Sequence, residues 1–122
     1  MPAQVGDLPS VSTFSPERVA FDESLLSRLT LPPGFAANVF ARDLGSVRVL
    51  VAAPDGTVYA SVPSAGTVLR LRDLDGDGRA ETVETVLEGY PRVHGLALGN
   101  GTLYVATMTH LYALREGALA KP

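Results

Sequence analysis

The feature that most constrains the fold is an internal repeat. The segment VLVAAPDGTVYAS (49–61) aligns with HGLALGNGTLYVAT (94–107) at an offset of 45 residues, counted from position 49 to position 94. Further on, TVLRLR (67–72) aligns with HLYALR (110–115) at an offset of 43. A period in the low forties with about four strands per repeat is typical of a β-propeller blade. The alternative is that two ordinary hairpins share the same turn chemistry.

Short apolar runs separated by Gly, Pro, Asn or Asp indicate strands from residue 36 onward. Two turns, Asp55-Gly56 and Asn100-Gly101, supply the positive φ that a tight hairpin requires. The expected strands are 37–40, 48–52, 57–62, 67–72, 81–87, 94–98, 102–107 and 111–114.

These strands predict an all-β fold, an incomplete β-propeller of about two four-stranded blades with a short N-terminal helical arm. We expect an arm over residues 1–30, a lead-in strand within 31–44 that would complete the last blade of a closed ring, a first blade over 45–88 and a partial second blade over 89–122. In the arm, Asp22 is the expected N-cap and Pro32 the expected stop of a short helix. A ring of four to eight blades would need further blades or associated copies of the chain.

Composition excludes several classes of function. Ten Lys and Arg against thirteen Asp and Glu give a net charge of −3, without the basic stripe that a nucleic-acid partner requires. The chain has no cysteine, and therefore neither disulfides nor a thiolate metal site. We expect no membrane span and no signal peptide, because neither the start MPAQVGDLPS nor any later stretch has the apolar run required.

The most specific chemical signal is the acidic loop DLDGDGRAETVE, residues 73–84. It matches the calcium-loop pattern D-x-D-x-D-G with Glu at the twelfth position, although its flanks are strand-like instead of helical. Such a loop predicts a structural Ca²⁺ in a hairpin connection, with its last ligand, Glu84, bidentate. The alternative is an ordinary solvated turn, which is also rich in Asp and Gly. The expected ligands are Asp73, Asp75, Asp77, the carbonyl of Arg79, Glu81 through water, and Glu84.

Blade topology places the candidate pocket residues Arg48, His94 and His110 on the face opposite the acidic loop. Arg48 offers a rigid fork for an anion or an ion pair with a neighbouring blade. Each histidine is either a pocket donor or base, or a strand-start residue bonded to a backbone carbonyl. No complete catalytic set is present, because the chain lacks a nucleophile elbow, a phosphate-binding glycine loop and a Cys/His zinc spacing.

Four motifs follow one another along the chain: LPPGFAANVFA (31–41), VRVLVAAPDGTVYAS (47–61), AGTVLRLRDLDGDGRAETV (65–83) and EGYPRVHGLALGNGTLYVAT (88–107). Together they resemble the N-terminal part of sorbosone-dehydrogenase-like proteins. These proteins are relatives of the soluble glucose dehydrogenase that depends on pyrroloquinoline quinone (PQQ). The resemblance implies a six-bladed, calcium-containing propeller that oxidises sugar hydroxyls or aldehydes in the periplasm or outside the cell. It implies that His94, in PRVHG, and Arg48 line the pocket, and that most catalytic residues lie in later blades.

Two functions follow as hypotheses. The first is a fragment of a PQQ-dependent sugar or aldehyde dehydrogenase, inactive by itself. The second is a non-catalytic, calcium-stabilised propeller repeat that binds a sugar or protein partner, because this fold has many unrelated functions.

Overall fold

The computed structural model describes residues 13–115 of the chain, in two compact units, Met1–Thr30 and Leu31–Pro122. The start of the predicted arm, 1–12, and the end of the predicted second blade, 116–122, lie outside the described residues. Within the described part of the chain, no helix has the length and apolar character of a membrane span.

The described part of the first unit contains one short helix. It is the 3₁₀ helix η2 (Glu23–Arg28), and its N-cap is Asp22, as predicted. The Asp22 carboxylate accepts a hydrogen bond of 2.9 Å from the backbone N–H of Ser24. This bond satisfies a donor that the helix start would otherwise leave unpaired.

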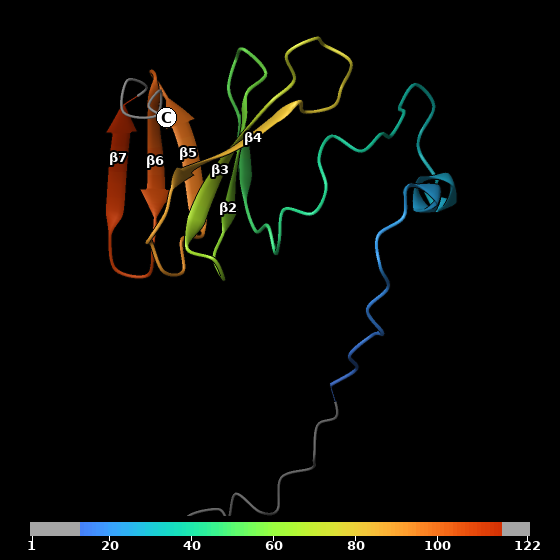
Figure 1. The fold of residues 1–122 in the computed structure, drawn as a ribbon, viewed down its shortest axis with the longest axis horizontal. Helices are drawn as coiled ribbons and strands as arrows, with labels where there is room; N and C mark the ends of the chain where they lie inside the picture. The colour runs from blue at the N-terminus through green and yellow to red at the C-terminus, as the bar shows by residue number, and fades with distance from the viewer. Residues whose placement is uncertain (1–12, 116–122) are drawn as a thin grey trace, which may run out of the picture. The chain divides into compact units, whose positions relative to one another are not determined.

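The second unit is all-β and consists of two antiparallel sheets (Figure 1). We call the four-stranded one sheet A, with the order β1 (Leu50–Ala52), β2 (Val58–Val62), β3 (Thr67–Arg72) and β4 (Thr82–Leu87). Sheet B has the order β5 (Gly95–Gly99), β6 (Thr102–Ala106) and β7 (Leu111–Arg115). The described strands do not close into a barrel, and the all-β expectation is confirmed at this level.

Seven of the eight predicted strands form, each within two residues of its expected ends. The strand expected over residues 37–40 is the exception, and that prediction is wrong. A strand needs a ladder partner, and this segment makes only one backbone bond to the sheet region, from Ala80 N–H to the carbonyl of Phe40 at 2.8 Å. Phe40 instead packs its side chain against sheet A.

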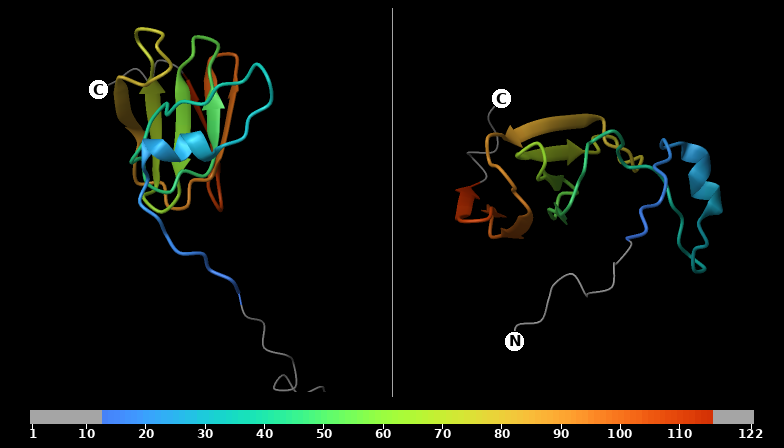
Figure 2. Two further views of the ribbon diagram at one scale, coloured as in Figure 1. Left: turned by 90° about the vertical axis from the view of Figure 1, so that its right-hand side faces the viewer. Right: turned by 90° about the horizontal axis from the view of Figure 1, so that it is seen from below.

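The core lies on both faces of sheet A. On one face, Tyr59 and Val68 of sheet A pack with Leu103 and Val105 of sheet B, and Figure 2 shows the two sheets side by side. On the other face, a second cluster packs against the lead-in segment; its buried members are Ala60, Val62, Leu69 and Leu71. The strict alternation along β2 and β3 explains why neighbouring residues contribute to different clusters.

The two hairpins of the repeat differ by one loop residue. Asn100 and Gly101 both have positive φ, 50° and 72°, in a two-residue turn. The β1–β2 loop has three residues and ends on Gly56 at φ 89°. Both are favoured hairpin geometries.

Candidate metal centre

The acidic loop connects β3 to β4, as the sequence predicts. It spans residues 73–81 and is closed by a hydrogen bond of 2.9 Å from Glu81 N–H to the carbonyl of Arg72. Gly76 and Gly78 have φ of 77° and 85°, a conformation that L side chains adopt only with strain. The two glycines therefore allow the chain to fold back on itself within nine residues.

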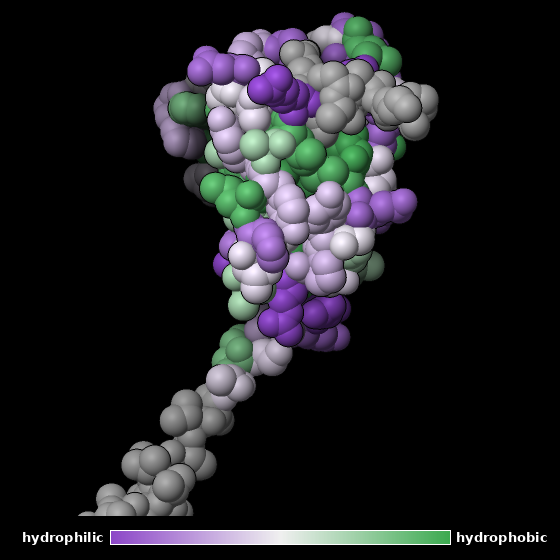
Figure 3. All heavy atoms as spheres, turned by 90° about the vertical axis from the view of Figure 1, so that its left-hand side faces the viewer, coloured by the Kyte–Doolittle hydropathy of each residue, from purple (hydrophilic) through white to green (hydrophobic). Residues whose placement is uncertain are grey.

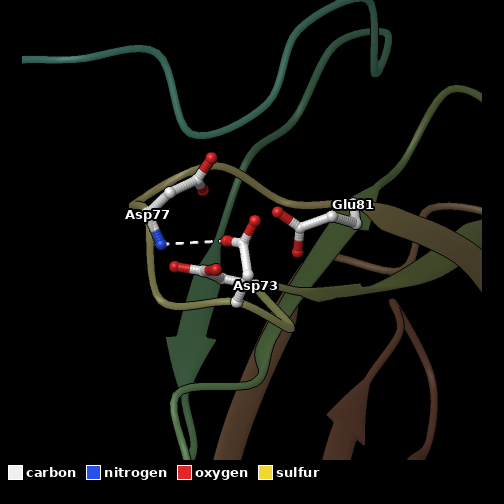
Figure 4. Close-up of side chains that lie close together, drawn as sticks. Asp73, Asp77 and Glu81 are labelled. Carbon is white, nitrogen blue, oxygen red and sulfur yellow. Dashed lines mark hydrogen bonds between the residues drawn. The ribbon is translucent and has the colours of Figure 1, made fainter.

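Four carboxylates of this loop converge. Asp73, Asp75, Asp77 and Glu81 each offer one oxygen, and these four atoms lie within 4.8 Å of one another. Figure 4 shows the carboxylates of Asp73, Asp77 and Glu81 directed toward a common space. Asp73 is half-buried and the other three are exposed. The group is chemically a set of hard oxygen donors, which suits Ca²⁺ or Mg²⁺.

Backbone N–H groups hold these carboxylates in place. Asp73 accepts two such bonds, from Gly78 at 2.8 Å and from Gly76 at 2.7 Å. The bond from Gly78 and then that from Gly76 lower the pKa of Asp73 below its ordinary value of 3.8, because they favour the charged form. Asp75 accepts from Asp77 N–H at 3.0 Å, and Asp77 accepts from Arg79 N–H at 2.8 Å.

Glu81 completes the set from the far end of the loop. Its Oε2 atom accepts a hydrogen bond from the backbone N–H of Leu74. The sequence predicted that Glu81 acts through water, whereas the structure places its carboxylate among the other three. The carbonyl of Arg79 stays a predicted ligand.

Glu84, the predicted bidentate ligand, lies outside this cluster. It sits on β4 directly opposite Arg70 of β3. The Arg70 guanidinium donates to Oε2 of Glu84 from Nε at 3.0 Å and also from Nη2. These bonds lower the pKa of Glu84 below its ordinary value of 4.5. In a twelve-residue calcium loop flanked by helices, the glutamate at the last position binds the ion. Here β4 begins at Thr82, so Glu84 is already part of the strand and its side chain lies away from the loop.

Asn38 is a supporting residue that sequence reasoning missed. Its side-chain Nδ2 donates a hydrogen bond of 2.7 Å to the carbonyl of Gly78, across 40 positions of sequence. A Cβ atom on Gly78 would lie only 3.2 Å from the same Nδ2. No local pattern around Asn38 signals this contact, because it depends on the path of the lead-in segment over sheet A.

Two of the predicted pocket residues, Arg48 and His110, line shallow cavities at the ends of the strands opposite the acidic loop. Arg48 lines a shallow cavity of about 460 Å³ with Pro63 and Ser64. His110 lines another, of about 490 Å³, with Arg92 among its neighbours. Both cavities are open to solvent, so neither encloses a ligand.

Each histidine has a local partner. His94 Nδ1 lies 3.0 Å from the carbonyl oxygen of Arg92, which matches the strand-start alternative. His110 Nδ1 lies 2.7 Å from Thr109 Oγ1, and its ring stacks on Tyr112 at a centroid distance of 5.6 Å. Both partners lie within two residues of their histidine, so neither contact brings distant parts of the chain together.

The chain matches no family model, no curated protein and no solved structure. Membership of the sorbosone-dehydrogenase-like family and the propeller identity therefore stay predictions. The geometry of the acidic loop stands independently of them.

Proposed function

We propose that this chain binds Ca²⁺ in the β3–β4 loop and that the ion serves a structural role in sheet A. The observation that carries the proposal is the convergence of Asp73, Asp75, Asp77 and Glu81, with ligand atoms within 4.8 Å of one another. Calcium is common to both hypotheses from the sequence, and this shared part is what the geometry supports.

The spacing of the oxygens suits calcium. Ca²⁺–oxygen bonds are about 2.3–2.6 Å long, so two ligands on opposite sides of the ion are about 4.6–5.2 Å apart. The four oxygens therefore fit within one calcium sphere, with room for water or a carbonyl as further ligands. Mg²⁺ binds oxygen at about 2.0–2.1 Å in a strict octahedron, which demands a tighter arrangement than a loop of exposed side chains imposes.

The ion would act on the fold through electrostatics. Four carboxylates at this distance repel one another, and exposure to water only partly screens that repulsion. A bound divalent cation replaces repulsion by attraction and joins the end of β3 to the start of β4. Because all protein ligands come from one short loop, we propose a structural ion and not a catalytic one.

Isothermal titration calorimetry of the full chain with Ca²⁺, and separately with Mg²⁺, tests the proposal. We expect a single calcium site with Kd between about 10 µM, the weak limit of sensor sites, and about 1 mM, the weak limit of extracellular sites. Calcium at about 100 times Kd raises the free energy of unfolding by about 2.7 kcal/mol. Absence of both heat and a shift in melting temperature would contradict the proposal.

The matched variants are Asp77→Ala and Asp55→Ala. Both aspartates accept a hydrogen bond from the backbone N–H two residues later, at 2.8 Å for Asp77 and 2.9 Å for Asp55. Only Asp77 belongs to the cluster. We expect Asp77→Ala to weaken calcium binding at least about tenfold, and Asp55→Ala to leave it unchanged.

A second pair of variants distinguishes the structure from the sequence pattern. Glu81→Gln removes a carboxylate of the cluster, whereas Glu84→Gln removes one that is bonded to Arg70. We expect calcium affinity to fall in Glu81→Gln and to be retained in Glu84→Gln. The reverse result would place the twelfth-position glutamate on the ion.

The dehydrogenase hypothesis would draw on the arginines and the histidine that line open cavities opposite the loop. An anionic quinone such as PQQ needs cations that converge on one enclosed site. Arg48 and Arg92 line shallow, open cavities that adjoin at Pro63 and Ser64 and enclose no ligand, so the described residues do not fit the quinone. We expect no dye reduction by the purified chain with added PQQ, Ca²⁺ and aldoses; turnover would restore this hypothesis.

A further inference from the structure

The internal repeat builds a cavity between the two sheets, outside the metal centre. Its two sides are equivalent segments of the repeat, 53–55 from the β1–β2 turn and 98–100 from the β5–β6 turn, at an offset of 45 residues. Both turns lie at the upper end of their sheets in Figure 1. The cavity has a volume of about 530 Å³, within the range of roughly 300–1,000 Å³ of ordinary small-molecule sites.

Tyr59 forms the floor of this cavity. It is 7% exposed and is the one buried residue among those described that line the cavity. Its hydroxyl has no hydrogen-bond partner among residues 13–115, and it is not sealed from solvent as Oγ1 of Thr82 is. The space that Tyr59 lines is this cavity. A buried tyrosine hydroxyl usually finds a partner, so a ligand in the cavity would supply one.

The charge of the cavity is negative. Of the described residues that line it, Asp55 alone is charged. Asp55 Oδ1 accepts a hydrogen bond of 2.9 Å from the backbone N–H of Thr57, which holds the side chain in place. Hydrogen bonds from Thr57 and, more weakly, the charge of Arg72 lower the pKa of Asp55, so the carboxylate is ionised at neutral pH. The cavity therefore favours a cation over an anion.

The cavity combines hydrogen-bond acceptors with apolar walls. The Asn100 side-chain carbonyl and the Tyr59 hydroxyl can accept hydrogen bonds in addition to the Asp55 carboxylate. A primary ammonium group has three N–H donors and no acceptor, and Pro54 and Leu98 offer apolar surface to its carbon chain. Apolar side chains also gather on the side of the molecule where β7 lies (Figure 3). The cavity differs from that surface because it adds a carboxylate, an amide and a hydroxyl.

We propose that the cavity between the β1–β2 and β5–β6 turns binds a small primary amine, with its ammonium group at Asp55 and Asn100 and its carbon chain against Pro54 and Leu98. The carboxylate of Asp55 selects a cation, and the ring of Tyr59 offers a π-face that attracts one. The inference is independent of the proposed calcium site, because no carboxylate of the acidic-loop cluster lines this cavity.

Titration of the full, isotope-labelled chain with benzylamine, followed by NMR without divalent cations, tests the proposal. Benzylamine is a cation at neutral pH, whereas benzyl alcohol is neutral and benzoate is an anion of nearly the same shape. We expect benzylamine to shift the amide resonances of residues 55–57 and 98–101 with a Kd of about 1 mM. The other two probes should bind at least about tenfold more weakly, because they lack the ionic contact with Asp55.

The repeat supplies a matched pair of variants. Asp55→Asn removes the charge but keeps an oxygen for the Thr57 bond, and it should weaken benzylamine binding at least about tenfold. Asn100→Asp gives the second turn the carboxylate of the first and should strengthen benzylamine binding. Tyr59→Phe keeps the ring in the core and should weaken binding by the loss of one acceptor. Glu88→Gln, which removes a charge at an exposed position outside the cavity, should bind as the wild type does.

Absence of shifts at benzylamine concentrations well above the expected Kd would overturn the proposal. Shifts confined to residues 73–81 would also overturn it, because they would show that the amine only follows the charge of the acidic loop. If benzyl alcohol binds as tightly as benzylamine, the ligand is a neutral molecule and not an amine. The spectra themselves show whether each variant is folded, and Asn100→Asp stays informative if Asp55→Asn is not.

Discussion

Sheets A and B are two copies of one sequence pattern in two different surroundings. Sheet A is covered on one face by sheet B and on the other by the lead-in segment, whereas sheet B is covered on one face in the described residues. As a result Tyr59 and its counterpart Tyr104 differ in exposure, 7% against 40%. In β2–β3 and β6–β7 the repeat determines which side of the sheet each residue takes, and the neighbouring layer determines whether that side is buried.

The acidic loop and the Arg70–Glu84 ion pair both belong to sheet A. Its β3–β4 connection contains the acidic loop, while the described part of sheet B has three strands and no such connection. Arg70, which pairs with Glu84, has Ala113 as its counterpart in the second copy of the repeat. The described residues of sheet A therefore include an acidic loop and an ion pair, whereas those of sheet B include an exposed apolar face.

The largest effect we expect comes from truncating the two equivalent tyrosines. Tyr59→Ala removes a ring from the core between the sheets and should lower the free energy of unfolding by about 3–5 kcal/mol. Tyr104→Ala should lower it by no more than about 1 kcal/mol, because that ring is partly solvated. Urea unfolding measures both.

Equal losses in the free energy of unfolding of the two variants would contradict the difference between the sheets, since they would mean that Tyr104 is buried too. If Tyr59→Ala is too unstable to measure, Tyr59→Leu keeps part of the apolar volume and should lie between the two.

Much of the second unit could be predicted because its signals are local. Alternating apolar runs and the Asp55-Gly56 and Asn100-Gly101 turns fix hairpins through backbone preferences of a few residues. The ends of β3, Thr67–Arg72, match the prediction at both residues. The failed strand at 37–40 shows the limit: a sequence can favour an extended chain, but a strand also requires a partner at its edge.

The site was predicted in part for the same reason. Asp73, Asp75 and Asp77 follow from loop chemistry within five residues, and the structure brings them together. The role of Glu84 depended on where β4 begins and on its ladder register with Arg70, which no loop motif encodes. The contribution of Asn38 depended on tertiary structure alone.

An intermediate effect should come from the ion pair of sheet A. The Arg70 side chain is 8% exposed and that of Glu84 is 45% exposed, so Glu84→Gln leaves a largely buried guanidinium without its carboxylate. We expect a melting temperature several degrees lower near neutral pH. Glu88→Gln, which removes the same charge at an exposed position, should change it little.

The pH dependence sharpens this prediction. Hydrogen bonding to Arg70 lowers the pKa of Glu84 in the folded state, so its contribution to stability is complete above the unfolded value of about 4.5 and is lost as pH falls through the folded value. The difference in free energy of unfolding between wild type and Glu84→Gln should therefore shrink in acid. A difference that stays constant down to acid pH would show that Arg70 does not depend on the Glu84 charge.

The smallest effect we expect separates the two glycines of the acidic loop. Both have positive φ, so alanine at either costs about 1 kcal/mol of backbone strain. A Cβ at Gly76 meets nothing within 4 Å, whereas at Gly78 it lies 3.2 Å from Asn38 Nδ2. Gly78→Ala should therefore lose more stability than Gly76→Ala, measured by urea unfolding without calcium.

Because removing the Asn38 side chain relieves that contact, Gly78→Ala in an Asn38→Ala background should cost no more than Gly76→Ala does. If the Gly78 variant stays more costly there, the lead-in segment supports the loop through its backbone and not through Asn38.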